Sequence, residues 1–176
     1  MLISKKIHDA INQQIGNEFG ASLQYVAIAT HFDLEALPQL AAHFYKQAEE
    51  ERDHAMRFVR FLCDADAAVV IPAVPAPKSK FSTAADAVQL SLDWELEVTK
   101  QINTLVAMAK KENDYTTDTF LQWFVKEQLE EVSSMDQLLK VIQRAGEGNL
   151  LRVEEYLARK GGHPAAGGSS MEPDAT

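Results

Sequence analysis

Hydrophobic residues recur at spacings of three and four along most of the chain, which is the period of an amphipathic helix. This pattern predicts four long helices, over about 4–33, 38–66, 84–112 and 118–146, and a shorter fifth helix over 149–160. Pro38 suits a first helical turn, Ser82 or Thr83 can cap the third helix, and Asn149 can cap the fifth. The stretch 161–176 is rich in Gly, Ser and Pro and cannot build a core. It is predicted to be a flexible tail after one domain at 1–160.

The connections between these segments predict the topology. The turns after Asp33 and around Asn113 are short, so each joins antiparallel neighbours. The Pro-rich link 67–83 can extend over roughly 50 Å at ~3.3 Å per residue. The second helix is about 43 Å long at ~1.5 Å per residue, so the link can return along its full length. We therefore expect an all-α fold, a four-helix bundle with one long crossover, a parallel second and third helix, and a short fifth C-terminal helix.

Each of the four apolar stripes is interrupted near its middle by one glutamate. These residues are Glu18, Glu51, Glu95 and Glu131. Long glutamates often extend to solvent from such positions. However, four of them on four facing stripes would be buried together, and a lone buried carboxylate costs several kcal/mol unless it is paired. No Lys or Arg lies on the stripes near them.

Four buried carboxylates carry the charge that two divalent cations would neutralise. His54 lies three residues after Glu51 on the same helix face and adds a nitrogen ligand. A donor set rich in oxygen, with few nitrogens and no thiolate, suits iron or manganese better than structural zinc. The pattern predicts a dinuclear metal site, which Tyr25, two turns after Glu18, would approach.

Composition excludes several other classes of function. The 176 residues are 46% hydrophobic, enough for one domain with a sizeable core. The net charge of −9 argues against nucleic acid and anionic membranes as partners. Cys63 is the single cysteine, so one chain forms no disulfide or Cys-based zinc site, and it is predicted to be a small core residue. No apolar run suits a signal peptide or the ~20 residues of a membrane span, which predicts a cytoplasmic location.

Three motifs carry a resemblance to a known family. They are N-E-F-G-A-S-L-Q-Y at 17–25, E-E-E-R-D-H-A at 49–55 and F-L-Q-W-F-V-K-E-Q-L-E-E at 120–131. Together they resemble the ferroxidase centre of bacterial non-haem ferritins, and the resemblance covers residues 1 to about 160. It implies oxidation of Fe(II) by O2 or H2O2, and storage of a ferric mineral inside a homo-oligomeric cage of 24 subunits.

The resemblance also implies roles for single residues. Glu18, Glu51 and His54 would hold one iron. Glu51 would bridge to a second iron, completed by Glu95 and Glu131 with Gln128 close by. The fourth helix carries Gln128-x-x-Glu131 where symmetrical di-iron bundles carry Glu-x-x-His. One iron position should therefore be weaker and more open, which suits iron in transit.

Other residues keep two interpretations. Glu50, Glu127 and Glu130 resemble a third iron site of bacterial ferritins, and each could equally be a solvated acid. The tyrosine that matches Tyr25 in ferritins hydrogen-bonds a ligand and donates an electron, whereas the alternative is a buried, satisfied tyrosine. Asp118 matches an acidic position at the threefold pore of ferritin cages; alternatively, it stabilises the N-terminus of its own helix. Trp94 and Trp123 are predicted to be packing residues, and Trp123 is also a candidate for electron transfer next to the metal site. His31 and His43 are predicted to have structural roles, and His163 is not expected to bind metal. The apolar run Val69–Ile71 is predicted to pack on the bundle or on another subunit.

Related classes fit the residues less well. Bacterioferritin binds haem through a methionine directly after the bridging glutamate, and that position is Arg52 here. We therefore predict no haem. Rubrerythrin-like peroxidases need a Cys-rich domain, and miniferritins lack the fifth helix and build their site between subunits. A helical interaction bundle without metal stays an alternative, which metal-dependent stability would distinguish.

Overall fold

The computed structural model describes residues 2–161, which form helices joined by loops, with no strand among them. The elements are α1 (Lys5–Leu34), α2 (Pro38–Asp64), α3 (Ala84–Lys111), α4 (Tyr115–Ala145), the 3₁₀ turn η1 (Glu147–Asn149) and α5 (Leu150–Gly161). None of the described helices is long and apolar enough to cross a membrane. The predicted tail, with His163, lies outside the described residues.

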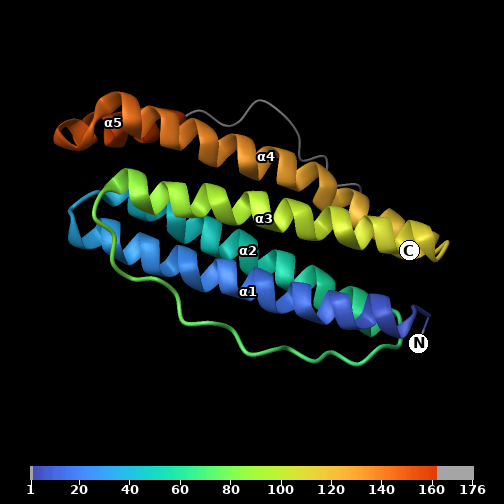
Figure 1. Cartoon of the computed structure of the whole chain (residues 1–176). Helices are drawn as coiled ribbons and strands as arrows, with labels where there is room; N and C mark the ends of the chain where they lie inside the picture. The colour runs from blue at the N-terminus through green and yellow to red at the C-terminus, as the bar shows by residue number, and fades with distance from the viewer. Residues whose placement is uncertain (1, 162–176) are drawn as a thin grey trace, which may run out of the picture.

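The four long helices form a bundle whose topology matches the prediction. Figure 1 shows α1 and α2 as antiparallel neighbours, followed by a crossover that returns along the whole bundle before α3 begins. As a result α2 and α3 run in the same direction, and α4 runs back against α3. The short α5 follows the end of α4 at one end of the bundle. The all-α fold with one long crossover and a short fifth helix is therefore confirmed.

Local side chains determine where three of the long helices begin. Ser4 accepts a hydrogen bond from the N–H of Ile7 (3.2 Å), and Thr83 accepts one from the N–H of Asp86 (3.0 Å), as expected of N-caps. Asp114 caps α4, so that helix begins three residues earlier than predicted. The predicted cap at Asn149 is wrong. Its side chain lies in the 3₁₀ turn and donates backward to the carbonyl of residue 145 (3.1 Å).

The start of α2 is capped from a distant part of the chain. Leu37 precedes this helix and offers no capping side chain. The buried carboxylate of Glu154, in α5, accepts hydrogen bonds from the N–H groups of Gln39 (2.7 Å) and Leu40 (2.9 Å). Glu147 does the same for the first two N–H groups of α3. A carboxylate at a helix N-terminus is favoured by the helix dipole, so both contacts fix the α5 end of the chain to the bundle.

Two polar side chains of α1 fasten the crossover. Asn12 accepts from the N–H of Val70 (2.6 Å). Gln24 accepts from the N–H of Lys78 (2.9 Å) and donates to its carbonyl (2.8 Å). These contacts satisfy backbone groups that have no partner within a helix or strand.

The crossover also approaches α1 very closely at one glycine. A Cβ atom on Gly16 would lie 2.3 Å from Cγ of Pro72. Of the apolar run that precedes Pro72, Val69 packs against the core, as predicted. Val70 and Ile71 remain 61% and 53% exposed in the single chain.

The core consists of two apolar clusters separated by a polar layer. One cluster contains residues 25–32 of α1, 40–48 of α2 and 135–142 of α4, and the other contains 7–15, 58–62 and 121–124 of the same helices. The stripe glutamates fall between the two clusters. Cys63 is exposed, so its prediction as a core residue is wrong. It follows the buried Leu62, and neighbouring residues on a helix point about 100° apart.

Candidate metal centre

The structure places the five predicted ligands of the dinuclear site together in the polar layer. They come from all four helices, and their exposed fractions are 1% for Glu18, 1% for Glu51, 4% for His54, 1% for Glu95 and 6% for Glu131. The glutamates therefore do not extend to solvent. Their position follows from the helix period, which turns each of these residues toward the bundle axis.

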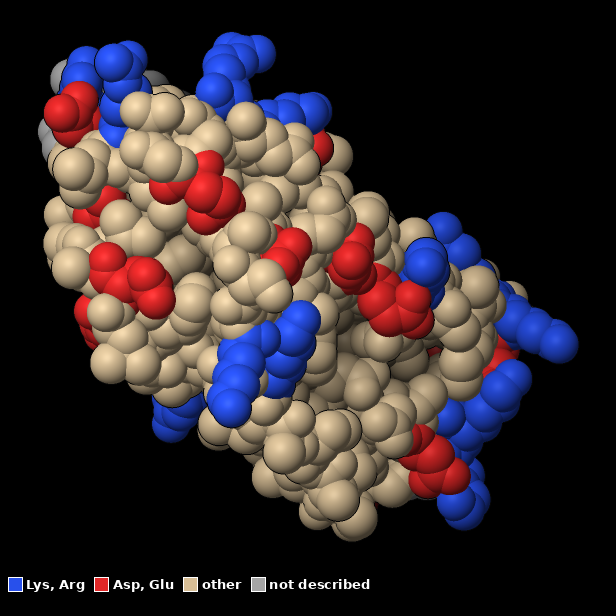
Figure 2. Space-filling view, turned by 60° about the vertical axis from the view of Figure 1, so that its left-hand side comes forward, with Lys and Arg blue, Asp and Glu red and all other residues tan. Residues whose placement is uncertain are grey.

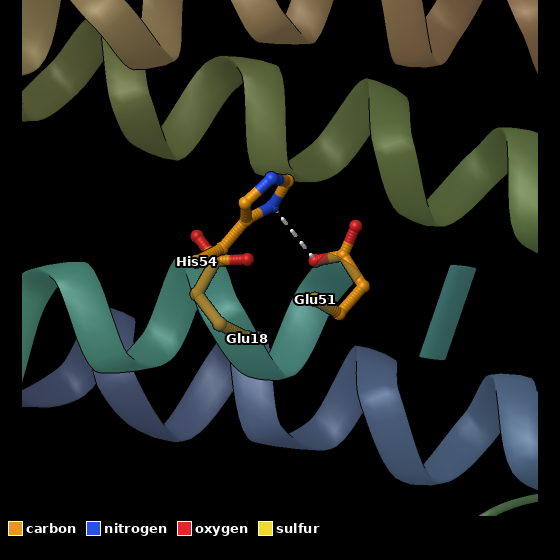
Figure 3. A group of neighbouring side chains, drawn as sticks. All are labelled: Glu18, Glu51 and His54. Atoms are coloured by element: carbon orange, nitrogen blue, oxygen red, sulfur yellow. Dashed lines mark ion pairs between the residues drawn. The ribbon is translucent and has the colours of Figure 1, made fainter. Parts of the chain in front are cut away.

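Three of these residues form a compact group, shown in Figure 3. The ligand atoms of Glu18, Glu51 and His54 all lie within 4.8 Å of one another. One oxygen of Glu51 lies 3.4 Å from Nδ1 of His54. Oε2 of Glu18 and Oε1 of Glu51 are buried and have no hydrogen-bond partner. Their lone pairs are available to a cation, which would fit between the three side chains.

A second group shares the histidine. His54, Glu127 and Glu131 also offer ligand atoms within 4.8 Å of one another. Glu127, predicted for a third site, is only half-buried. Its proximity to His54 was not predicted, because the hydrophobic period of a single helix does not specify the rotation of α4 relative to α2.

Glu95 is engaged in hydrogen bonds on both oxygens. The hydroxyl of Tyr25 donates to Oε1, and Nε2 of Gln128 donates to Oε2 (3.1 Å). Gln128 also donates to the backbone carbonyl of Glu95 (3.1 Å) and lies 3.3 Å from the hydroxyl of Thr99. Tyr25 and Gln128 are both buried, at 0% and 3% exposed. Each of these oxygens has a second lone pair, so Glu95 can bind a cation while it keeps both hydrogen bonds.

Burial and mutual repulsion raise the pKa values of these carboxyl groups. Burial, with the nearby charge of Glu51, raises the pKa of Glu18 well above its usual range. Burial and then Glu95 do the same for the pKa of Glu51, and burial raises the pKa of Glu95. For Glu131, burial with the charge of Glu95 raises the pKa to about 8. Raised pKa values favour the protonated carboxyl groups, so a divalent cation would displace protons as it binds.

Gln14 supports the compact group, a role that was not predicted from the sequence. Its buried amide donates to Oε1 of Glu18 (2.8 Å), which leaves Oε2 free. Asn17 links Gln14 to Gln101 of α3, with N···O distances of 3.4 Å and 3.0 Å. The spacing of four between Gln14 and Glu18 is visible in the sequence and is a known helix pairing.

Aromatic rings close the centre on one side. The ring of His54 meets Trp123 edge-on at 5.4 Å and Phe124 at 5.9 Å. The guanidinium of Arg57 lies 3.9 Å from the centre of the Trp123 ring, within the range of a cation–π contact. Trp94 is also packed against the apolar core. These contacts agree with the packing roles predicted for both tryptophans.

The remaining predicted residues lie nearer the surface. Oε1 of Glu50 pairs with Nζ of Lys46 (2.9 Å), and its other oxygen accepts from Gln47. Glu50, Glu127 and Glu130 line one groove between α2, α4 and α5. Figure 2 shows acidic and basic side chains interspersed on its face of the molecule, with no continuous basic patch.

Two further sequence predictions concern single residues on α4 and α2. Asp118 lies in the first turn of α4 and accepts a hydrogen bond from Gln122 (2.8 Å). Arg52, where bacterioferritin would need its haem-binding methionine, is exposed and points toward Asp53 at 4.0 Å. A pore role for Asp118 stays a prediction.

A four-helix bundle with one crossover and a buried layer of glutamates and histidine defines the class of ferritin-like metal proteins. The comparisons with known proteins agree. A family model described as a ferritin-like domain matches residues 8–145. The chain is 46% identical over 173 residues to Ferritin BfrB of Mycolicibacterium smegmatis, covering 98% of this chain and 94% of that protein. It is 35% identical over 146 residues to bacterial non-heme ferritin of Staphylococcus aureus, covering 83% and 88%.

Solved structures give the same result. The open pore ferritin of Archaeoglobus fulgidus superimposes with a TM-score of 0.86 at 34% sequence identity, covering 89% of this chain and 96% of that one. The chain therefore belongs to the ferritin family. The family and the buried Glu/His layer support iron storage as its function, with iron as its substrate.

Proposed function

We propose that the protein oxidises Fe(II) at this centre and stores the product as a ferric oxide-hydroxide mineral. The observation that carries the proposal is the buried group of Glu18, Glu51 and His54, in which two carboxylate oxygens have no partner. Two Fe(II) ions supply two electrons, which reduce O2 to H2O2 or H2O2 to two molecules of water.

The two iron positions differ in how many of their ligand oxygens already accept hydrogen bonds. Glu18, Glu51 and His54 bind one Fe(II) ion without giving up a hydrogen bond through their free oxygens. The second ion takes Glu51 as a bridge, with Glu95 and Glu131 as further ligands and Gln128 nearby. Both oxygens of Glu95 already share their electron density with hydrogen-bond donors, whereas Glu18 and Glu51 each keep an oxygen with no partner, so this second position is the weaker one. Iron that binds weakly can leave for storage.

The protein contributes position and charge to the reaction. The carboxylates hold two ions close together, so that both electrons are available to one oxidant molecule. Iron binding replaces the protons that burial holds on the glutamates. The resulting cluster of negative charge stabilises Fe(III) more than Fe(II), which favours electron loss.

Assembly and traffic complete the proposal. We expect a cage of 24 subunits in the cytoplasm, without haem. The exposed Val70 and Ile71 are candidate subunit contacts. Asp118 would line an entry pore. Glu50, Glu127 and Glu130 would form a third iron site along the path from the centre.

One experiment tests oxidation and storage together. Fe(II) is added aerobically to metal-free protein, ferric absorbance is followed, and the coloured product is sized by gel filtration. We expect oxidation much faster than in buffer, with iron retained on a very large assembly. Glu51→Gln should lose the fast phase, whereas Glu49→Gln, an exposed glutamate on the same helix, should keep it. Oxidation at the buffer rate, with iron precipitating beside small protein, would refute the proposal.

A further inference from the structure

A groove of about 460 Å³ lies between α2, α4 and α5. The glutamates at positions 50, 127, 130 and 131 line its part next to the metal centre. His43 and Gln47 of α2, together with Tyr156 of α5, line the part that leads toward α5. The groove therefore continues beyond the three acids already considered as a third iron site.

Two side chains that line this groove each carry a buried polar atom with no partner. Among the described residues, four buried side-chain atoms lack a hydrogen bond. Two are the oxygens of Glu18 and Glu51 in the metal centre, and the others are Nε2 of His43 and Oε1 of Gln47. Gln47 is only 6% exposed. Because an unsatisfied buried acceptor costs about 1–3 kcal/mol, two such atoms on side chains that line one groove point to a ligand.

The chemistry of both atoms suits a cation. The amide nitrogen of Gln47 donates to Glu50, so its free oxygen can only accept or coordinate. Burial lowers the pKa of His43 to about 4; the charges of Lys160 and Lys46 lower it further, and Glu50 opposes them. The imidazole is therefore neutral at pH 7, and one ring nitrogen keeps a lone pair. Residues four apart lie on the same helix face, so both donors can reach one ion.

We propose that His43 and Gln47 form a further binding site for a divalent first-row metal ion, with Glu50 as the adjacent carboxylate. One nitrogen and neutral and charged oxygens suit Fe(II), Co(II) and Zn(II). The ammonium group of Lys46 forms an exposed ion pair with Glu50, and a divalent ion can displace that ammonium group. Water completes the coordination, so the site binds more weakly than the buried centre and holds ions on their way along the groove.

The proposal is tested with Zn(II), which binds without oxidation and so separates this site from the proposed ferroxidase function. Crystals of the full chain are soaked in ZnCl2, and anomalous difference maps are calculated on both sides of the zinc absorption edge. We expect a zinc peak about 2.0–2.1 Å from Nε2 of His43, the usual Zn–N distance, in addition to peaks at Glu18, Glu51 and His54. A water molecule or no density at His43 would overturn the proposal.

Variants then test the pair in solution by equilibrium dialysis against Zn(II). His43→Ala and Gln47→Leu should each lose one bound Zn(II) per subunit while keeping the ions of the buried centre. His31→Ala is the matched control, since His31 packs against the rings of Phe32 and Phe81 outside the groove. Circular dichroism and gel filtration establish that each variant is folded and assembled. Unchanged zinc stoichiometry in folded His43→Ala or Gln47→Leu would also overturn the proposal.

Discussion

Glu131→Gln should stabilise the metal-free protein, although it removes a proposed ligand. The pKa of Glu131 in the folded protein is about 8, compared with the ordinary value of 4.5. The folded state therefore binds this proton more tightly than the unfolded state does. Its contribution to stability is complete below pH 4.5 and is lost as the pH rises from 4.5 to 8. Glutamine resembles the protonated form at every pH, so the variant avoids this loss.

The size of the effect follows from the same pKa difference. Between pH 4.5 and pH 7, about 2.5 pH units, the free energy of unfolding of the wild type falls by ~1.4 kcal/mol per unit, or about 3 kcal/mol in total. For a domain of this length, that corresponds to a rise in Tm of roughly 6–12 °C. At pH 5 the same difference falls below about 1 kcal/mol, because the pH is then only slightly above the ordinary pKa of the unfolded state.

Thermal unfolding of metal-free protein, followed by circular dichroism in excess chelator at pH 5 and pH 7, measures this difference. Glu130→Gln is the control, because Glu130 is the adjacent residue and is exposed. Saturating Zn(II) should reverse the order, since the wild type then gains the larger stabilisation from binding. The reasoning is refuted if Glu131→Gln is no more stable than Glu130→Gln at pH 7, or if its gain is the same at both pH values.

Three further substitutions test individual contacts. Gln14→Leu removes the hydrogen bond to Glu18, and the loss of ~1.5 kcal/mol should lower the initial oxidation rate at limiting Fe(II) roughly tenfold. Gln13→Leu changes an exposed neighbour, so an equal fall in rate in that variant would contradict this prediction. Gly16→Ala places a methyl group against Pro72 and should destabilise the protein by about 1–3 kcal/mol in urea unfolding. Gly148→Ala has open space and should change little, so equal effects would disprove the clash. Glu154→Ala removes the acceptor for two N–H groups of α2 and should lower stability by about 1–2 kcal/mol, whereas the exposed Glu155→Ala should stay within about 0.5 kcal/mol.

The helices, and the face of each helix on which a stripe residue lies, follow from the hydrophobic pattern alone. Position on a helix face is a local property, set by 3.6 residues per turn. For that reason the helical period alone assigns Glu18, Glu51, Glu95 and Glu131 to the core. Cys63 lies one residue beyond the stripe position Leu62, so the same period places it outside the core, where the structure has it.

The contacts between these residues depend on how the helices pack against one another. The rotation and axial position of each helix bring Glu127 to His54, and they let Tyr25 and Gln128 occupy both oxygens of Glu95. They also carry the Glu154 carboxylate to the start of α2, where the local sequence offers no cap. Such contacts join residues far apart along the chain. They depend on how whole helices and the crossover pack, which the period of any single segment does not specify.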